Sequence, residues 1–355
     1  MKKVILLSLL LSVPFCFSQN KVEAEKLVEE GIPYHDKGDF EGAINKYDKA
    51  LELDKNNVLA LTEKAFSLLS LKEYDKTITI CKSLIESNPN DTKLKTVYVT
   101  YGNALDGQNK TDKSIEIYTE GISKFPDYYQ LYYNKGVTYA SVKKNDEAII
   151  CFQNALLQNP KHSSSNNGLG RLEKAKGNRI PAILSFCRFL IIEPQTNRSK
   201  ENLASLKELL MQGVKKTGEN AISLSIDPKD LDSDDKREKT KENNFNSTNM
   251  ILSMTSALDF DDKNKDKTEI ENFIRKMETI CASLSETKKT NFGFYWEYFA
   301  PYFVELKKNN LLEPFAYIVF ASSEEEYIKN WIKNDKTELD KFYNWSKEYK
   351  WKNIK

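Results

Sequence analysis

The 355-residue sequence is poor in cysteine and histidine, the residues that most often build disulfide scaffolds and metal centres. Its five cysteines are too few to cross-link a chain of this length, which excludes a disulfide-built scaffold, and we expect no disulfide. The two histidines, His35 and His162, have no cysteine or carboxylate partner at metal-ligand spacing. The sequence therefore predicts no metal site.

Catalytic and cofactor motifs are missing as well. We find no glycine-rich phosphate loop, no nucleophile elbow and no paired motif for acid–base catalysis. The acidic segment at residues 259–266 first suggests a calcium loop, but counting from Asp262 puts Lys267 where the motif needs glycine and Phe273 where it needs glutamate. We therefore predict no catalytic residue and no cofactor, and we interpret the acidic segment as a solvated loop.

An excess of charge of one sign is also missing. Lysine and arginine number 53, aspartate and glutamate 52, and the formal net charge is +1. Proteins that bind the nucleic-acid backbone carry a basic excess. The balance predicts no nucleic-acid partner.

Long hydrophobic runs are absent apart from one near the amino terminus. Lys2 and Lys3 precede an apolar run over residues 4–17, which is too short to span a bilayer comfortably. A basic start, a short apolar run and a small residue at the cleavage point are typical of a secretory signal. We predict a signal peptide at 1–18, cleavage near Ser18, and an exported chain, periplasmic or secreted, with no transmembrane segment once mature.

Two alternatives to cleavage near Ser18 stay open. One is a retained membrane anchor, and the other is a lipoprotein attached through Cys16. Lipoprotein signals usually have a small residue before the cysteine, and Phe15 is large, so lipidation is the less favoured reading.

What the first half of the sequence does contain is a periodic pattern. Small residues recur at separations of 34, 37, 34 and 34, and a column of helix-ending residues repeats the same separations. The two columns are Gly31, Ala65, Gly102, Gly136 and Gly170, and Lys55, Pro89, Pro126, Pro160 and Pro194. Two independent columns in one register indicate a structural unit repeated five times.

Within each unit the apolar residues follow helical spacing, which predicts two amphipathic helices. In the fourth unit the second helix carries Ala148, Phe152 and Ala155, a large side chain between two small ones. Small residues let helix backbones approach while the aromatic ring fills the space opposite, so the pattern predicts closely packed helical hairpins.

This residue order resembles the tetratricopeptide repeat family. The family's small residue, aromatic, Ala-x-x-x-aromatic and late proline stand at Gly136, Tyr139, Ala148, Phe152 and Pro160. The resemblance implies an all-α solenoid of helical hairpins over residues 24–214. The expected repeats are 24–57, 58–91, 95–128, 129–162 and 163–196, with a closing helix at 199–213. Polar Asn166 and Glu173 replace apolar residues in the last repeat, as expected where a terminal repeat meets solvent or another domain.

Beyond the solenoid, residues 216–246 lose helical periodicity and gain charge, which predicts a charged linker; residues 221–226 alternate for long enough to form a short strand. Residues 247–355 regain helical spacing and are predicted to form a smaller helical domain. It holds all four tryptophans, Trp296, Trp331, Trp345 and Trp351. Helical spacings such as Tyr327 to Trp331 favour a packed core, and an exposed platform that stacks on sugars is the alternative.

The resemblance also suggests where a partner could bind, because the first helix of each hairpin lines the concave side of such a solenoid. Positions one after and three before the small column lie four residues apart, hence on one face. The partner-binding residues predicted there are Phe66, Asn103, Tyr133, Val137, Asn167 and Arg171. Apolar, aromatic and amide groups together suit an extended or helical peptide. The alternative is that this face packs against neighbouring helices or the C-terminal domain.

Relatives that clamp a chaperone tail by its carboxylates carry several basic residues on this face. Here the only basic groups are Arg171 and Lys174, both in the last repeat, which argues against such a clamp. The sequence as a whole predicts a non-catalytic protein-interaction or scaffold protein of the bacterial cell envelope, with a protein or peptide partner. Glycan binding by the aromatic C-terminal domain is the alternative, and an unrecognised enzyme is less favoured.

Overall fold

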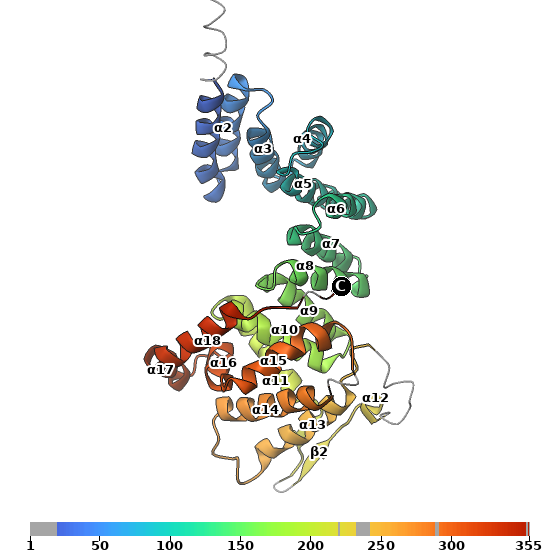
Figure 1. Cartoon of the computed structure of the whole chain (residues 1–355), viewed down its shortest axis with the longest axis vertical. Helices are drawn as coiled ribbons and strands as arrows, with labels where there is room; N and C mark the ends of the chain where they lie inside the picture. The colour runs from blue at the N-terminus through green and yellow to red at the C-terminus, as the bar shows by residue number, and fades with distance from the viewer. Residues whose placement is uncertain (1–19, 219–220, 232–241, 288–290, 353, 355) are drawn as a thin grey trace, which may run out of the picture. The chain divides into compact units, whose positions relative to one another are not determined.

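The computed structural model describes residues 20–218, 221–231, 242–287, 291–352 and 354 (Figure 1). The predicted signal peptide at 1–18, its cleavage point and Cys16 lie outside these residues. The described chain forms two compact units, one ending at Cys151 and the other beginning at Phe152.

The first unit is a series of helical hairpins at the predicted period. Residues 20–36 are helical, and are followed by α2 (Phe40–Leu53), α3 (Val58–Ser70), α4 (Tyr74–Ser87), α5 (Leu94–Gly107), α6 (Thr111–Lys124) and α7 (Tyr129–Ser141). The next helix, α8 (Asn145–Gln158), begins in this unit and ends in the second (Figure 1). Successive helices pack together, and the first helices α3, α5 and α7 also contact one another in turn. The predicted all-α solenoid is confirmed.

The small-residue column marks the seam of each hairpin. A Cβ atom added at Gly102 would lie 2.3 Å from Cε1 of the fully buried Tyr118, and one at Gly31 would lie 2.4 Å from Cε1 of Tyr47. Both distances are far below van der Waals contact, so the aromatic residue of the second helix requires glycine opposite it. This is the interlocking of large and small residues that the sequence pattern predicts.

The second unit contains the last repeat and everything that follows it (Figure 1). Its repeat helices are α9 (Ser163–Ala175), α10 (Arg179–Ile192) and α11 (Asn197–Leu210). They are followed by β1 (Val214–Lys216), β2 (Ile222–Leu224), α12 (Pro228–Leu231), α13 (Asn246–Ala257), η2 (Leu258–Phe260), α14 (Glu269–Thr287), η3 (Tyr295–Phe299), α15 (Ala300–Lys308), α16 (Leu312–Val319), α17 (Glu326–Asn334) and α18 (Lys336–Glu348). The closing helix α11 thus starts two residues earlier than predicted and stops at Leu210, because Gly213 adopts a left-handed φ of 78° beyond its end.

Helix α10 is the centre of the second unit. Residues 179–191 are all buried, because α9 and α11 pack on α10 together with α13 and α16 from the C-terminal region. A helix that is apolar all round is a buried helix. The C-terminal helices therefore form one compact unit with the last repeat, which differs from the separate domain expected at 247–355.

The segment predicted as a charged linker contains regular structure. Strands β1 and β2 pair antiparallel, with Val214 opposite Leu224, and both contact α13. The strand expected within 221–226 is present as β2, and its partner β1 was not predicted. Lys215 and Lys216 lie at exposed positions of β1. These charged residues give β1 the composition of a linker, which is why the strand was not predicted.

The aromatic residues of the C-terminal region mostly form its core. Trp296 is 1% exposed, and Phe245 stacks on it with ring centroids 4.5 Å apart. Tyr302 and Trp351 stack with centroids 5.1 Å apart, and the buried guanidinium of Arg188 contacts both rings, with its Cζ 4.3 Å and 4.6 Å from the two centroids. Faces occupied in this way cannot stack on a sugar, which favours the packed-core interpretation for these rings.

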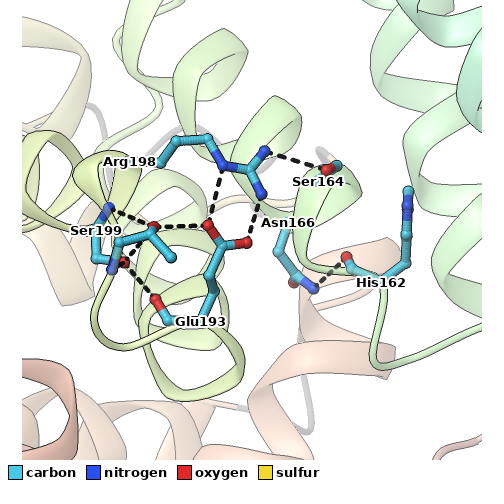
Figure 2. Close-up of polar contacts among 7 residues, drawn as sticks. His162, Ser164, Asn166, Glu193, Arg198 and Ser199 are labelled. Carbon is cyan, nitrogen blue, oxygen red and sulfur yellow. Dashed lines mark hydrogen bonds and ion pairs between the residues drawn. The ribbon is translucent and has the colours of Figure 1, made fainter. Parts of the chain in front are cut away.

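Polar contacts join the last repeat to the closing helix (Figure 2). Glu193 accepts hydrogen bonds from Arg198 and Thr196, and Arg198 also donates to Ser164, 34 residues earlier. Thr196 and Ser199 form a capping box at the start of α11. The contact between Ser164 and Arg198 links equivalent positions of successive units, so α11 takes the place of the first helix of a further repeat.

His162 lies beside this junction, and we expect it to make the second unit sensitive to acid. Burial, assisted by the charge of Arg198, lowers the pKa of His162 from 6.5 to about 4. In the unfolded chain the imidazole of His162 takes up a proton near its ordinary pKa of 6.5. In the folded chain it does so only near the lowered pKa of about 4. Between these values the unfolded state binds more protons, so stability falls as pH falls through the window.

Allowing for partial exposure, His162 should account for a loss of about 1–2 kcal/mol in the free energy of unfolding from pH 7 to pH 4. Urea titrations of the wild type and of His162→Gln at the two pH values measure it. The variant should lose less stability on acidification, since glutamine does not titrate. Equal losses in both proteins would contradict the prediction.

Candidate peptide-binding groove

The predicted partner-binding residues of the first unit lie on its contacting first helices. Phe66 on α3 and Val137 on α7 are 45% and 40% exposed. Asn103 on α5 and Tyr133 on α7 are half-buried, and Asn103 Oδ1 accepts a hydrogen bond of 2.6 Å from Tyr118. Large apolar side chains thus remain open to solvent on a layer of packed helices.

A pocket of about 240 Å³ lies on this layer, between α3, α5 and the start of α7. Its lining residues are Thr62, Glu63, Phe66, Thr96, Val99, Thr100, Tyr128 and Gln130. Thr62, Phe66 and Val99 belong to the two columns from which the groove was predicted. Of the predicted partner-binding residues, Phe66 lines this pocket, whereas Asn103, Tyr133 and Val137 are not part of its lining.

Phe66 packs against His35, a residue of the preceding hairpin. The ring of His35 stacks on it with centroids 4.6 Å apart, and His35 Nδ1 lies 2.7 Å from Ser67 Oγ. Burial lowers the pKa of His35, so the imidazole is neutral near pH 7 and the stack is uncharged. One side of the pocket is thus a fixed apolar surface.

The charges of the pocket are acidic. Glu63 is the one charged residue in its lining, and no lysine or arginine of the described chain takes part. Burial and the nearby Asp36 raise the pKa of Glu63. A carboxylate would meet this side chain as a like charge, so the pocket suits an apolar side chain accompanied by a hydrogen-bond donor or a cation.

Asn167 and Arg171 belong to the second unit, where both lie on α9. Asn167 is half-buried, and its Oδ1 is a buried acceptor without a partner in the described chain. Arg171 is exposed and borders a separate hollow of about 400 Å³. Lys174 borders the same hollow and is paired with Glu208 at 2.6 Å, so one of the two basic groups on α9 is already neutralised.

Some pocket residues were missed by the sequence reasoning. Thr96 and Gln130 lie seven residues before the predicted Asn103 and Val137, which is two helical turns along the same face. Extending each column by one heptad would have found them. Glu63 and Tyr128 do not follow from this extension, because Glu63 lies beside the predicted column on α3 and Tyr128 is the extended residue before α7.

Comparison with known proteins agrees with the repeat architecture. Residues 33–72 match a model described as TPR repeat, and residues 129–162 match one described as tetratricopeptide repeat. The chain thus contains tetratricopeptide repeats.

Related proteins match part of the chain. The protein STIP1 homolog of Dictyostelium discoideum is 28% identical over 169 residues, covering 39% of this chain and 30% of that protein. A small glutamine-rich tetratricopeptide repeat-containing protein of the same organism is 26% identical over 188 residues, covering 52% of this chain and 53% of that protein. The chain thus spans about half or less of these relatives. A solved structure of Pseudomonas aeruginosa pilF has a TM-score of 0.45 and 18% identity, covering 55% of this chain and 91% of that one.

Two further observations concern the described residues as a group. None of their helices is long and apolar enough to cross a membrane. They also contain no cluster of three or more histidine, cysteine, aspartate or glutamate side chains that could hold a metal ion. Asp259, which the sequence placed in a solvated acidic loop, instead contacts Arg275 and Lys276 and is largely buried.

Proposed function

We propose that this protein is a non-catalytic interaction scaffold whose first unit binds a peptide segment of a partner along α3, α5 and α7. The observation that carries the proposal is the pocket around Phe66 and Val99. It is formed by successive repeats, and Phe66 leaves nearly half of its surface exposed. Tetratricopeptide repeats provide such stacked first helices as a continuous surface for binding proteins.

The chemistry of the pocket narrows the class of peptide. An apolar side chain would fit against Phe66, Val99 and Tyr128, and a neighbouring amide or basic group would meet Glu63. Interfaces concentrate binding energy in a few such anchors. We therefore favour a peptide with an apolar anchor beside a basic or neutral polar residue over an acidic carboxyl-terminal tail.

Site-specific photo-crosslinking tests this proposal in the native host. A photoreactive amino acid replaces Val137, on the proposed groove, or Ile150, which is 56% exposed on the second helix α8. A partner bound along the first helices should crosslink from position 137 and not from position 150. Crosslinking from position 150 with none from position 137 would contradict the proposal.

We further propose that the chain is exported to the bacterial cell envelope. The basic residues and apolar run at the amino terminus support this, and the mature chain should begin at Gln19. Amino-terminal mass spectrometry of protein from the native host measures it. An intact Met1 or a lipid on Cys16 would contradict cleavage at this point.

A further inference from the structure

The second unit contains a pocket, of about 350 Å³, that the repeat function does not use. It lies between the closing helix α11, the loop after η2, α14 and the end of α16. Its lining residues are Lys207, Leu210, Met211, Asp259, Lys267, Glu269, Asn272, Phe273, Lys276 and Phe320. A volume of a few hundred Å³ at the junction of two helical layers is typical of small-molecule sites.

One ion-pair cluster beside this pocket has more cations than carboxylates. Lys276 is only 5% exposed, and it shares the single carboxylate of Asp259 with Arg275. The other two lysines of the lining are each matched, Lys207 by Glu269 at 2.7 Å and Lys267 by Glu271 at 3.3 Å. Two cations on one carboxylate leave one positive charge in excess, and this excess is more costly at Lys276 than at Arg275, whose side chain is 22% exposed.

Two hydrogen-bonding groups beside this ion-pair cluster are also unsatisfied. Asn272 Oδ1, on the pocket wall, and Nε of the adjacent Arg275 are buried without a partner among the described residues. Burial lowers the pKa of Lys276 even though Asp259 faces it, so the site disfavours this charge as it stands. A carboxylate could accept a hydrogen bond from Arg275 Nε, whereas Asn272 Oδ1 is itself an acceptor and would need a donor from another part of the ligand.

Part of the lining is apolar and aromatic. The rings of Phe273 and Phe320 meet edge to face with centroids 5.0 Å apart, and Leu210 and Met211 line the side contributed by α11. Lys207 Nζ lies 5.1 Å from the centroid of the Phe320 ring. A ligand that enters the pocket therefore meets both cations and apolar side chains.

We propose that this pocket binds a small organic anion, whose carboxylate pairs with Lys276 and whose apolar body packs against Phe273 and Phe320. A second carboxylate would balance the two cations that now share Asp259. The volume favours a small molecule over a folded partner. This site lies wholly in the second unit, so it is independent of the groove proposed for the first.

Ligand-observed NMR and calorimetry on the purified full chain test the proposal with a defined panel. The probes are acetate, hexanoate and phenylacetate, each compared with its neutral amide. Hexanoate and phenylacetate should bind, acetate more weakly for lack of an apolar body, and the amides about tenfold or more weaker than their acids. Lys276→Met should weaken phenylacetate binding by about tenfold or more, whereas Lys333→Met, at an exposed site on α17, should not.

Lys276→Met should fold, because Asp259 then pairs with Arg275 alone, and a thermal melt checks this. Lys207→Met, at a 38% exposed side chain, is a second variant and should weaken binding severalfold. The proposal is overturned if no carboxylate of the panel binds, or if the amides bind as tightly as the acids. It is also overturned if folded Lys276→Met and Lys207→Met both bind like the wild type.

Discussion

Replacing Arg179 by methionine should lower the free energy of unfolding of the second unit by about 3–5 kcal/mol. Arg179 is 5% exposed at the start of α10. Its Nε donates to Leu209 O at 2.8 Å and its Nη2 to Leu210 O at 3.1 Å. These are carbonyl groups at the end of α11, where a cation is also favoured by the helix dipole. Its Nη1 reaches α13 through Ser253 Oγ at 2.7 Å. One side chain therefore joins three helices.

The size of the effect follows from what the substitution leaves behind. Burial lowers the pKa of Arg179 to about 10, so the side chain is charged at neutral pH and its hydrogen bonds are charge-assisted. Methionine fills similar space but offers no donor, so Leu209 O loses the hydrogen bond that Arg179 provides. Ser256 Oγ still donates to Leu210 O at 2.7 Å, which limits the loss.

Arg198→Met is the matched control, because Arg198 is an arginine of the same unit that is 45% exposed. Its ion pair with Glu193 should contribute about 0–1 kcal/mol. Urea unfolding of the two variants, followed by circular dichroism, measures the difference. If both substitutions cost the same, Arg179 does not hold the three helices together as described.

Replacing Phe66 by glutamate should weaken capture of the native partner by about a hundredfold or more. The substitution removes the aromatic wall of the pocket and places a second carboxylate near Glu63, so an apolar anchor would lose its contacts and meet charge. Phe66 is 45% exposed, and the protein should therefore stay folded apart from the lost stacking with His35.

Ile150→Glu is the control for added charge on an exposed apolar residue of the same unit. Affinity capture from native extract, quantified by mass spectrometry, compares the two variants with the wild type. Folded Phe66→Glu that captures the partner with unchanged affinity would place binding elsewhere on the protein. Unfolding of that variant would show that Phe66 is chiefly a packing residue.

The sequence predicted the repeats well because their chemistry is local. Gly102 and Tyr118 belong to one hairpin and contact each other at a spacing set by two helices and a short turn. The same small and large residues recur in each repeat, so each boundary is supported several times. The groove was predicted in part for the same reason, since Phe66 and Val99 follow from the periodic columns. Glu63 was not, because the side of a helix that reaches a pocket depends on how neighbouring hairpins stack.

By itself, then, the sequence determined an all-α solenoid and its repeat period, because period and register are properties of adjacent residues, and the face on which a partner binds stays a prediction. Only the tertiary structure decided that α10 is buried on every side, that β1 and β2 pair within the presumed linker, and that Lys276 and Arg275 share Asp259. The burial of α10 involves distant segments, α13 and α16, whereas the other two features join nearer segments that share no periodic pattern. Their stability comes from burial and from pairing of charges in three dimensions, which no local pattern encodes.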